Sequence, residues 1–306
     1  MSSDDLPDWL PAWCLDRLGG EPADVLFHRH GMSTVFGLRL IGGREVVVKA
    51  RADDGRAASC VAAQAWLAGR GFPCPRPLTP VVGAGSLAVH AEEFRPGGEV
   101  LRGDSPEVAV GYARVFARLM AGLADLTVVP PLPNPRWIRW DHSDPGLWPS
   151  IGFLDERDQG AVPAYVVDTA ARVRERLLAA RLPCVLGHAD FEAQNLRWHG
   201  REVWAVHDWD SLAWQPEAAL AGAASGTFAS AGPPTLAPIA GSEAFLRSYQ
   251  DIRGRRFTAA ELEVAWAAGL WVAAHNARWE ALHGDRPVTG DALKVQADER
   301  LRRAHC

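Results

Sequence analysis

The chain has 306 residues, of which 48% are hydrophobic and 23% charged, a balance typical of a globular protein with two lobes or two domains. Its formal net charge of -5 argues against a general nucleic-acid-binding protein, which normally carries a basic excess. No apolar run is long enough to span a membrane, and the acidic start lacks the features of a signal peptide. The 5 cysteines show no C-x-x-C spacing, so we expect a cytoplasmic protein with neither nucleic acid nor membrane as a partner.

The first third of the chain is predicted to be rich in β-strands. Strands are expected where short apolar runs lie between glycine-rich or polar turns, at residues 25–27, 35–40, 45–49, 78–82 and 87–94. A rough apolar stripe before Gly19 predicts a helix within residues 1–20. A second helix is predicted over residues 56–69, because Gly69 and the prolines beyond it cannot continue one. The third predicted strand ends at Lys49.

The composition changes after residues 95–98, and the remainder is predicted to be mostly helical. Helical periodicity is expected at residues 106–126, 162–181, 216–230, 238–252, 258–283 and 289–303. A segment rich in proline and tryptophan, residues 127–160, separates the first two of these helices. We therefore predict an α+β protein with two regions, residues 1–97 and residues 98–306.

Two short segments of the second region carry residues suited to phosphoryl transfer. His188-Ala189-Asp190 is followed five residues later by Asn195, and an apolar strand beyond a glycine-containing turn leads to Asp208. In phosphoryl transfer from ATP, one carboxylate orients the attacking hydroxyl, while an amide and a second carboxylate hold Mg²⁺ against the phosphates. The alternative is that His188 and Asp190 only cap a turn and that Asn195 ends a loop.

With this order of elements and motifs, the sequence resembles the aminoglycoside phosphotransferase family, which includes choline and homoserine kinases and shares its fold with protein kinases. The resemblance covers roughly residues 20–285 and is strongest around the catalytic motif. It implies a protein-kinase-like, two-lobed fold. Residues 1–97 would form a nucleotide-binding lobe with a small antiparallel sheet and one main helix. Residues 98–306 would form a larger helical lobe with the catalytic loop, the metal site and an acceptor pocket.

The resemblance also assigns roles to matching residues. Asp190 would be the catalytic base, His188 would hold the loop, and Asn195 and Asp208 would bind Mg²⁺. The nucleotide, ATP or GTP, would be contacted by Lys49 at its phosphates, by the loop of Ser33 and Thr34, and by the backbone of the linker Glu92, Glu93 and Phe94.

One departure concerns the helix at residues 56–69. Kinase-like folds pair the strand lysine with a glutamate on this helix, yet here the helix contains no acidic residue. Gln64 is the best-placed substitute, because it could hydrogen-bond Lys49 although it supplies no charge.

The segment after Asp208 favours a small-molecule acceptor. Gln215-Pro216-Glu217 follows almost at once, which leaves no room for the activation loop of a protein kinase. An acidic, aromatic pocket for a cationic alcohol could be lined by Asp210, Glu217 and Trp214, and by the carboxylates and tryptophans of residues 137–158. Alternatively, these carboxylates are solvated loop residues, the tryptophans are core, and Asp210 supports the metal site.

The sequence therefore predicts an ATP- and Mg²⁺-dependent phosphotransferase that acts on a hydroxyl group of a small molecule. A second hypothesis is a non-catalytic nucleotide- or metabolite-binding protein on a kinase-like fold, supported by the missing helix glutamate. Metal-assisted hydrolysis, suggested by His207 beside Asp208, is a weaker third hypothesis because no metal-binding cluster accompanies these residues.

Overall fold

The structure, a computed structural model, describes residues 6–128, 132, 134–230 and 235–306. The chain divides into two compact units, and neither unit is continuous in sequence. Among the described residues, the first unit contains the chain up to Gly97, a short stretch at Thr127, and Ala205–Asp210. The second unit contains the remaining chain from Gly98 onward. One boundary therefore lies where the composition changes, whereas the return of Ala205–Asp210 to the first unit was not predicted.

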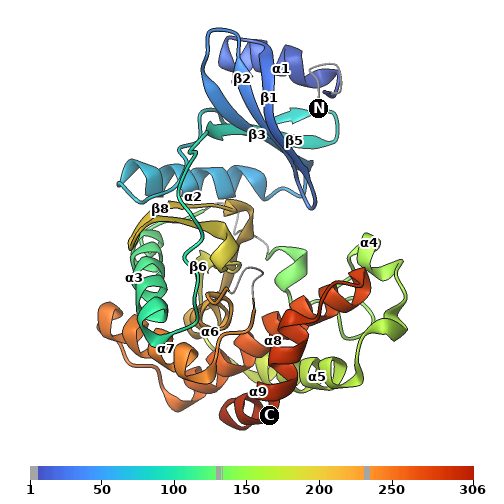
Figure 1. Cartoon of the computed structure of the whole chain (residues 1–306), viewed down its shortest axis with the longest axis vertical. Helices are drawn as coiled ribbons and strands as arrows, with labels where there is room; N and C mark the ends of the chain where they lie inside the picture. Colours follow the sequence, from blue (N-terminus) through green and yellow to red (C-terminus); the bar gives the residue numbers. More distant parts are fainter. Residues whose placement is uncertain (1–5, 129–131, 133, 231–234) are drawn as a thin grey trace. The chain divides into compact units, whose positions relative to one another are not determined.

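The first unit is built on an antiparallel sheet of five strands in the order β1-β2-β3-β5-β4 (Figure 1). Its strands are β1 (Pro22–His30), β2 (Thr34–Leu40), β3 (Glu45–Ala52), β4 (Val82–Ala84) and β5 (Leu87–Glu93). The helices of this unit are α1 (Trp9–Leu18) and α2 (Ala57–Gly69). The predicted strand at residues 78–82 is wrong except for Val82, because Pro77 and Pro80 lack the amide hydrogens that a regular strand uses in its ladder.

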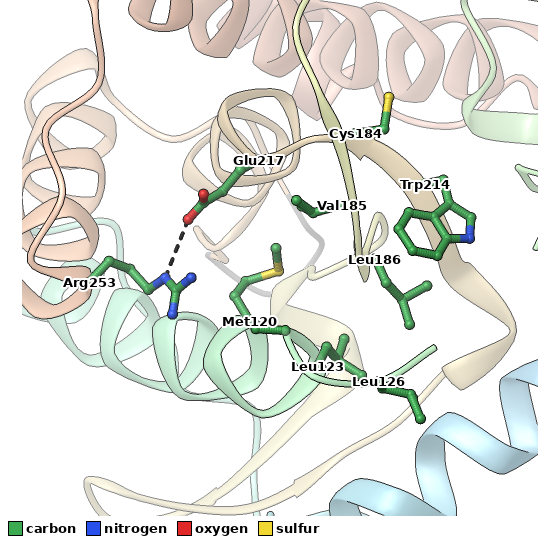
Figure 2. Close-up of a pocket in the computed structure, with 10 residues that line it drawn as sticks. Met120, Leu123, Leu126, Cys184, Val185, Leu186, Trp214, Glu217 and Arg253 are labelled. Atoms are coloured by element: carbon green, nitrogen blue, oxygen red, sulfur yellow. Dashed lines mark hydrogen bonds and ion pairs between the residues drawn. The ribbon is translucent and has the colours of Figure 1, made fainter. Parts of the chain in front are cut away.

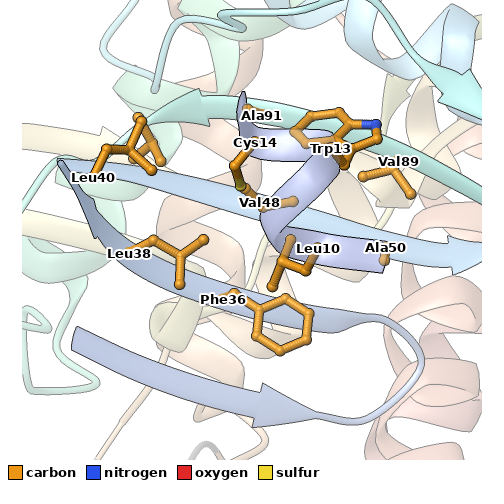
Figure 3. Close-up of a cluster of buried hydrophobic side chains, with 11 residues drawn as sticks. Leu10, Trp13, Cys14, Phe36, Leu38, Leu40, Val48, Ala50, Val89 and Ala91 are labelled. Carbon is orange, nitrogen blue, oxygen red and sulfur yellow. The ribbon is translucent and has the colours of Figure 1, made fainter. Parts of the chain in front are cut away.

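Alternation along the strands gives the sheet one apolar and one polar face. Leu10, Trp13 and Cys14 of α1 pack on the apolar face, as Figure 3 shows. They meet inward residues that recur at every second position, namely Phe36, Leu38, Leu40, Val46, Val48, Ala50, Val89 and Ala91. The intervening residues of β3 and β5 point to the opposite face, because side chains alternate along a strand. Lys49 and Arg51 of β3 and His90 and Glu92 of β5 therefore share that opposite face.

The second unit is mostly helical. Its main helices are α3 (Pro106–Leu123), α5 (Ala164–Ala179), α6 (Glu217–Thr227), α7 (Ile239–Arg253), α8 (Ala259–His283) and α9 (Val288–Ala304), with a short α4 (Gly152–Asp155). The helix α8 packs against α5, α6 and α9. It begins with a capping box, in which Thr258 and Glu261 satisfy each other's backbone amides. The helices predicted in this region are confirmed to within a few residues at most ends, and so is the α+β fold class.

Two short strand pairs carry the loops of the predicted catalytic segment. The strand β6 (Cys184–His188) pairs antiparallel with β9 (Leu212–Pro216), and β7 (Leu196–His199) pairs with β8 (Glu202–Val206). The strand β9 was not predicted. Short 3₁₀ turns occur at Arg136–Ile138, Gln159–Ala161, Ala193–Asn195 and Trp209–Ser211. No helix within the described ranges has both the length and the apolar character needed to cross a bilayer.

Candidate functional site

The catalytic motif forms a loop that is braced by its own residues. His188 ends β6 and is fully buried, and its Nδ1 accepts a hydrogen bond from the backbone N–H of Asp190 at 3.3 Å. The Asn195 amide nitrogen donates to both the backbone oxygen and Oδ2 of Asp190, each at 2.9 Å. The structure thus brings Asp190 and Asn195 into contact. Because the amide nitrogen makes these bonds, the amide oxygen of Asn195 remains suited to a cation.

Glu192 is an acidic residue of this loop that the sequence reasoning overlooked. Its side chain is buried, with 4% of its surface exposed. Gln194 donates to Oε2 at 2.6 Å, and Asn276 of α8 donates to Oε1 at 3.0 Å. The position of Glu192 between the Asp and the Asn of the motif was a sequence signal for its role in the loop. Its partner Asn276 could not be found in the same way, because it lies 84 positions away along the chain. Asn276 therefore connects the catalytic loop to the longest helix described.

Asp208 lies in the first unit, two residues beyond β8. Its backbone has a φ of 63°, in the left-handed region that few residues other than glycine adopt. Aspartate tolerates this region better than most residues, and strained positions of this kind cluster at functional sites. Asp208 also contributes to raising the pKa of Lys49, which places its charge near that lysine.

Lys49 forms a buried ion pair with Glu92 on the polar face of the sheet. The lysine Nζ lies 2.9 Å from Glu92 Oε1, and the two side chains are 13% and 3% exposed. Gln64 donates to Glu92 Oε2 and to the backbone oxygen of Pro75, both at 2.8 Å. The expected hydrogen bond between Lys49 and Gln64 is therefore replaced by one that Gln64 donates to Glu92, the carboxylate that pairs with the lysine. Glu92, which we had expected only in the linker, supplies the charge that α2 lacks.

The strand register explains this pairing. Lys49 lies directly opposite His90, and Glu92 is two positions further along β5. Diagonal neighbours on one face of an antiparallel pair are within reach of long side chains. Burial alone would raise the pKa of Glu92, but Lys49, His90 and Gln64 together hold it below its ordinary value. Burial alone would lower the pKa of Lys49, but Glu92, Asp210 and Asp208 raise it. Both groups are therefore charged at neutral pH.

Asp210 belongs to the same polar face and not to the helical unit. Its Oδ1 lies 3.3 Å from Nη1 of Arg51, and its Oδ2 accepts a hydrogen bond from the Ser33 hydroxyl at 3.1 Å. Arg56 donates to the Asp210 backbone oxygen at 3.0 Å. Both carboxylate oxygens are thus engaged within the first unit, which does not support the prediction that Asp210 lines an acceptor pocket in the helical region. Ser33 lies near the charged cluster, and Thr34 instead bonds His30 at 3.0 Å.

Glu93 is the last residue of β5, and Phe94 is the residue after it. The Glu93 carboxylate accepts a hydrogen bond from the Arg76 backbone N–H at 3.2 Å, and the Phe94 ring lies 5.9 Å from the Phe27 ring. The absence of a side chain at Gly37 leaves room for the Phe27 ring, because a Cβ there would lie 2.2 Å from that ring. The backbone contact of Glu93 and Phe94 with adenine stays a prediction.

Glu217 and Trp214 line a small pocket of about 150 Å³ in the second unit (Figure 2). Glu217 accepts hydrogen bonds from the Tyr249 hydroxyl at 2.6 Å and from Nε of Arg253 at 3.3 Å. This pocket lies beside Cys184 at the first end of β6, whereas Asp190 follows the other end. The pocket is also lined by Val185 and Leu186, so it extends along β6 toward the end that carries the catalytic loop. The carboxylate of Glu217 joins α6 to α7 through these bonds, and its contact with the acceptor stays a prediction.

Most carboxylates of the segment from residue 141 to residue 158 are engaged locally. Asp141 pairs with Arg139 at 3.2 Å, and Asp144 accepts from the Ser150 N–H at 2.9 Å. Asp155 accepts hydrogen bonds from the Ile151 backbone N–H and from Arg278. Asp158 accepts one from the Gly160 backbone N–H. These carboxylates stabilise turns, which favours the alternative reading of the segment over an acidic pocket for a cation.

Asn195, in the second unit, and Asp208, in the first, each carry an oxygen of the kind that a hard cation such as Mg²⁺ prefers, and their shared binding of Mg²⁺ stays a prediction. Mg²⁺ is usually bound by one or two protein oxygens together with substrate phosphates. No cluster of three or more His, Cys, Asp or Glu residues that could hold a metal ion occurs in the described parts of the chain. Such a cluster is needed for a zinc site but not for nucleotide-bound magnesium.

The fold is similar to those of several solved phosphotransferases. An amicoumacin kinase, hAmiN, bound to AMP-PNP, Ca²⁺ and Ami matches with a TM-score of 0.64 at 14% identity, over 96% of this chain and 93% of that one. A thermostable mutant of APH(4)-Ia in a ternary complex with AMP-PNP and hygromycin B gives 0.57 at 15% identity, over 96% and 98%. An aminoglycoside phosphotransferase from Alicyclobacillus acidocaldarius gives 0.55 at 14% identity, over 99% and 96%. At these identities the likeness establishes the fold alone.

Sequence comparison assigns the family. No curated protein matches the chain. The sequence model of the phosphotransferase enzyme family (APH) matches residues 25–257, which is most of the chain and includes both the polar face of the sheet and the catalytic loop. The chain therefore belongs to the APH phosphotransferase enzyme family.

Proposed function

We propose that this chain is an ATP- and Mg²⁺-dependent phosphotransferase that transfers the γ-phosphate to a hydroxyl group of a small molecule. The observation that carries the proposal is the braced catalytic loop, in which Asn195 holds the Asp190 carboxylate at 2.9 Å. A protein that only binds nucleotide has no chemical need for this arrangement. The family membership and the AMP-PNP bound to hAmiN support the same function.

Asp190 acts as the base in this proposal. Its carboxylate accepts the hydrogen bond of the acceptor hydroxyl, orients the oxygen toward the phosphorus and takes up the proton as the bond forms. Asn195 keeps the carboxylate in one orientation, and buried His188 fixes the backbone of the loop through the Asp190 N–H. Positioning of this kind supplies much of the rate enhancement in phosphoryl transfer.

The first unit binds the nucleotide in this proposal. Lys49, oriented by Glu92, contacts the phosphates, and Ser33 and Thr34 lie over them, with ATP or GTP as the nucleotide. Asn195 and Asp208 supply oxygen ligands to Mg²⁺, which neutralises charge on the phosphates when bound. The backbone of the linker residues Glu93 and Phe94 contacts the adenine or guanine ring of the nucleotide. We place this activity in the cytoplasm.

Calorimetric titration of ATP into the protein, with Mg²⁺ and then with EDTA, tests the proposal. We expect binding that depends on the metal, that disappears in Asp208→Ala and that persists in Asp190→Asn. In an assay of ADP release with an accepted alcohol, Asp190→Asn should lower kcat by about 10²- to 10⁴-fold, the usual contribution of a general base. Wild-type turnover by Asp190→Asn would exclude Asp190 as the base.

The non-catalytic alternative loses its main support in the structure. That hypothesis rested on the missing helix glutamate, and Glu92 now supplies a buried carboxylate to Lys49 at 2.9 Å. Absence of ATP and GTP binding under both metal conditions would nevertheless favour it over the phosphotransferase.

A further inference from the structure

One face of α8 presents a row of aromatic and imidazole rings. Trp271, His275, Trp279 and His283 follow one another at intervals of four residues, a spacing that places side chains on the same side of a helix. The Trp279 and His283 rings are stacked with centroids 4.2 Å apart. We call Trp271, His275, Trp279 and His283 the ring row.

Two aromatic residues from the segment before α5 cover the ring row. The Trp148 ring lies 5.4 Å from the Trp271 ring and 6.3 Å from the His275 ring. Phe153 of α4 makes an edge-to-face contact with Trp279 at 5.7 Å, where α4 and the end of α8 lie side by side (Figure 1). Trp271 is buried, whereas Phe153 and Trp279 are 43% and 38% exposed. The aromatic surface therefore extends from the interior of the unit to the solvent.

The ring row lies close to the catalytic loop. Asn276, the neighbour of His275, donates to the buried carboxylate of Glu192 at 3.0 Å, and Glu192 is two residues from Asp190. Trp279 is one helical turn beyond this contact, a rise of about 5 Å. A small molecule of two or three rings could therefore contact the exposed end of the ring row while presenting a hydroxyl to Asp190.

Around the buried part of the ring row, the charges of Arg278 and Asp155 offset each other. Arg278 is buried, pairs with Asp155 at 3.2 Å and lies 5.3 Å from the Trp148 ring. Burial lowers the pKa of His275 to about 4, so this imidazole is uncharged at neutral pH. Its Nδ1 is buried and has no hydrogen-bond partner among the residues that the structure describes. Glu192 already accepts two hydrogen bonds from amides.

We propose that the ring row, together with Trp148 and Phe153, binds a planar, uncharged ring system of the acceptor and selects it over a polycationic aminoglycoside. This inference rests on the proposed function, because it assigns the acceptor class of that same catalytic loop. Planar rings stack on exposed aromatic side chains in offset or edge-to-face arrangements, and such pairs are stabilised beyond the burial of their area.

Ring binding can be measured on the nucleotide-free protein, and hence separately from catalysis. Saturation-transfer NMR with 2-naphthylmethanol, its fully saturated decahydro analogue and kanamycin compares a planar ring, a non-planar ring and a polycation. We expect the naphthyl alcohol to bind more tightly than the other two. Equal binding of the naphthyl and decahydro alcohols, or preferential binding of kanamycin, would overturn the inference.

Variants of exposed residues locate the binding. Trp279→Ala and Phe153→Ala should each weaken naphthyl alcohol binding about three- to tenfold, the loss expected for one aromatic contact. Trp279→Phe should retain most of the affinity. Leu178→Ala on α5 is the matched control, because Leu178 is also an exposed apolar residue on a helix of the same unit and lies outside the ring row. Unchanged binding in both Trp279→Ala and Phe153→Ala would contradict the inference.

The calorimetric titration of ATP tests the proposed phosphotransferase function separately from the proposed ring site. Naphthyl binding without binding of ATP and Mg²⁺ would support the ring site and reject the phosphotransferase. Binding of ATP and Mg²⁺ together with turnover of kanamycin but not of the naphthyl alcohol would support the phosphotransferase and reject the ring site.

Discussion

At the scale of single residues, the position of one carboxylate distinguishes this chain from the usual kinase arrangement. In kinase-like folds the glutamate that pairs with the strand lysine lies on a helix. Here the partner of Lys49 is Glu92 on β5, and Gln64 occupies the helix position and donates to that carboxylate. Because β3 and β5 are hydrogen-bonded neighbours, the register of the sheet holds the ion pair in place.

We predict that Glu92→Gln impairs nucleotide use and also lowers stability, because it unpairs a buried charge. Removing the charge leaves Lys49 without its nearest carboxylate. A hydrogen bond to a charged group contributes about 1.5 to 3 kcal/mol, so we expect the KM for ATP to rise about 10-fold or more. The measurement is steady-state kinetics as a function of ATP concentration, together with urea unfolding to monitor stability.

The double substitution Glu92→Gln with Gln64→Glu returns the carboxylate to α2 and keeps the same two functional groups in the cluster. Recovery of much of the wild-type KM would show that the charge beside Lys49 matters, whichever element carries it. A wild-type KM in Glu92→Gln alone would contradict a positioning role for Glu92. Glu93→Gln is a suitable control, because the Glu93 side chain lies at the same strand end and is 42% exposed.

At the scale of elements, local patterns predicted most of the fold. The helix α3 has a strongly periodic apolar run and a serine cap, and α8 starts with a capping box and ends at Gly284, so their sequences indicate them clearly. The strand β9 is only five residues long and forms because β6 is available to pair with it, which no local pattern reveals. The Lys49–Glu92 pair was likewise hidden in the register of two strands separated by α2. Sequence spacing did reveal Asp190 and Asn195, because their contact lies within one loop.

The packing of α6 on α8 gives an element-scale prediction. A Cβ at Gly222 would lie 2.0 Å from the backbone oxygen of Ala265, so the two helices approach too closely for any side chain there. We expect Gly222→Ala to destabilise the protein by about 1 to 3 kcal/mol, as in other overpacked cores, even though alanine is the better helix former.

Gly111 of α3 provides the matched control. It also lies inside a helix, but a Cβ there would meet nothing within 4 Å. Gly111→Ala should therefore stabilise the protein by up to about 1 kcal/mol through helix propensity alone. Urea unfolding of both variants measures the difference. Two variants of equal stability would mean that the contact between α6 and α8 relaxes without cost.

At the scale of the whole molecule, the first unit is completed by a segment from far along the chain. Arg51 and Arg56 are buried in this unit, and Asp210 supplies a carboxylate oxygen to the first and its backbone oxygen to the second. The N–H of Val206 also bonds the backbone oxygen of Pro73 at 2.8 Å. The Trp209 ring packs edge-on against Phe72 with centroids 6.0 Å apart. A cut after residue 97 therefore removes part of the core of this unit.

We predict that a fragment of residues 1–97 does not fold stably by itself. In this fragment Arg51 keeps Asp54 at 2.7 Å but loses Asp210, and Arg56 loses the Asp210 backbone oxygen. Each lost hydrogen bond to a charged group costs about 1.5 to 3 kcal/mol, so together with the lost packing of Trp209 the loss is comparable with the whole stability of a small domain. Appending residues 203–211 through a flexible glycine-serine linker should restore a cooperative urea transition, measured by circular dichroism. The same appended fragment with Asp210→Asn should be less stable, because the asparagine cannot neutralise Arg51. Equal transitions for the bare and the appended fragments would show instead that residues 205–210 only lie on the unit and do not contribute to its stability.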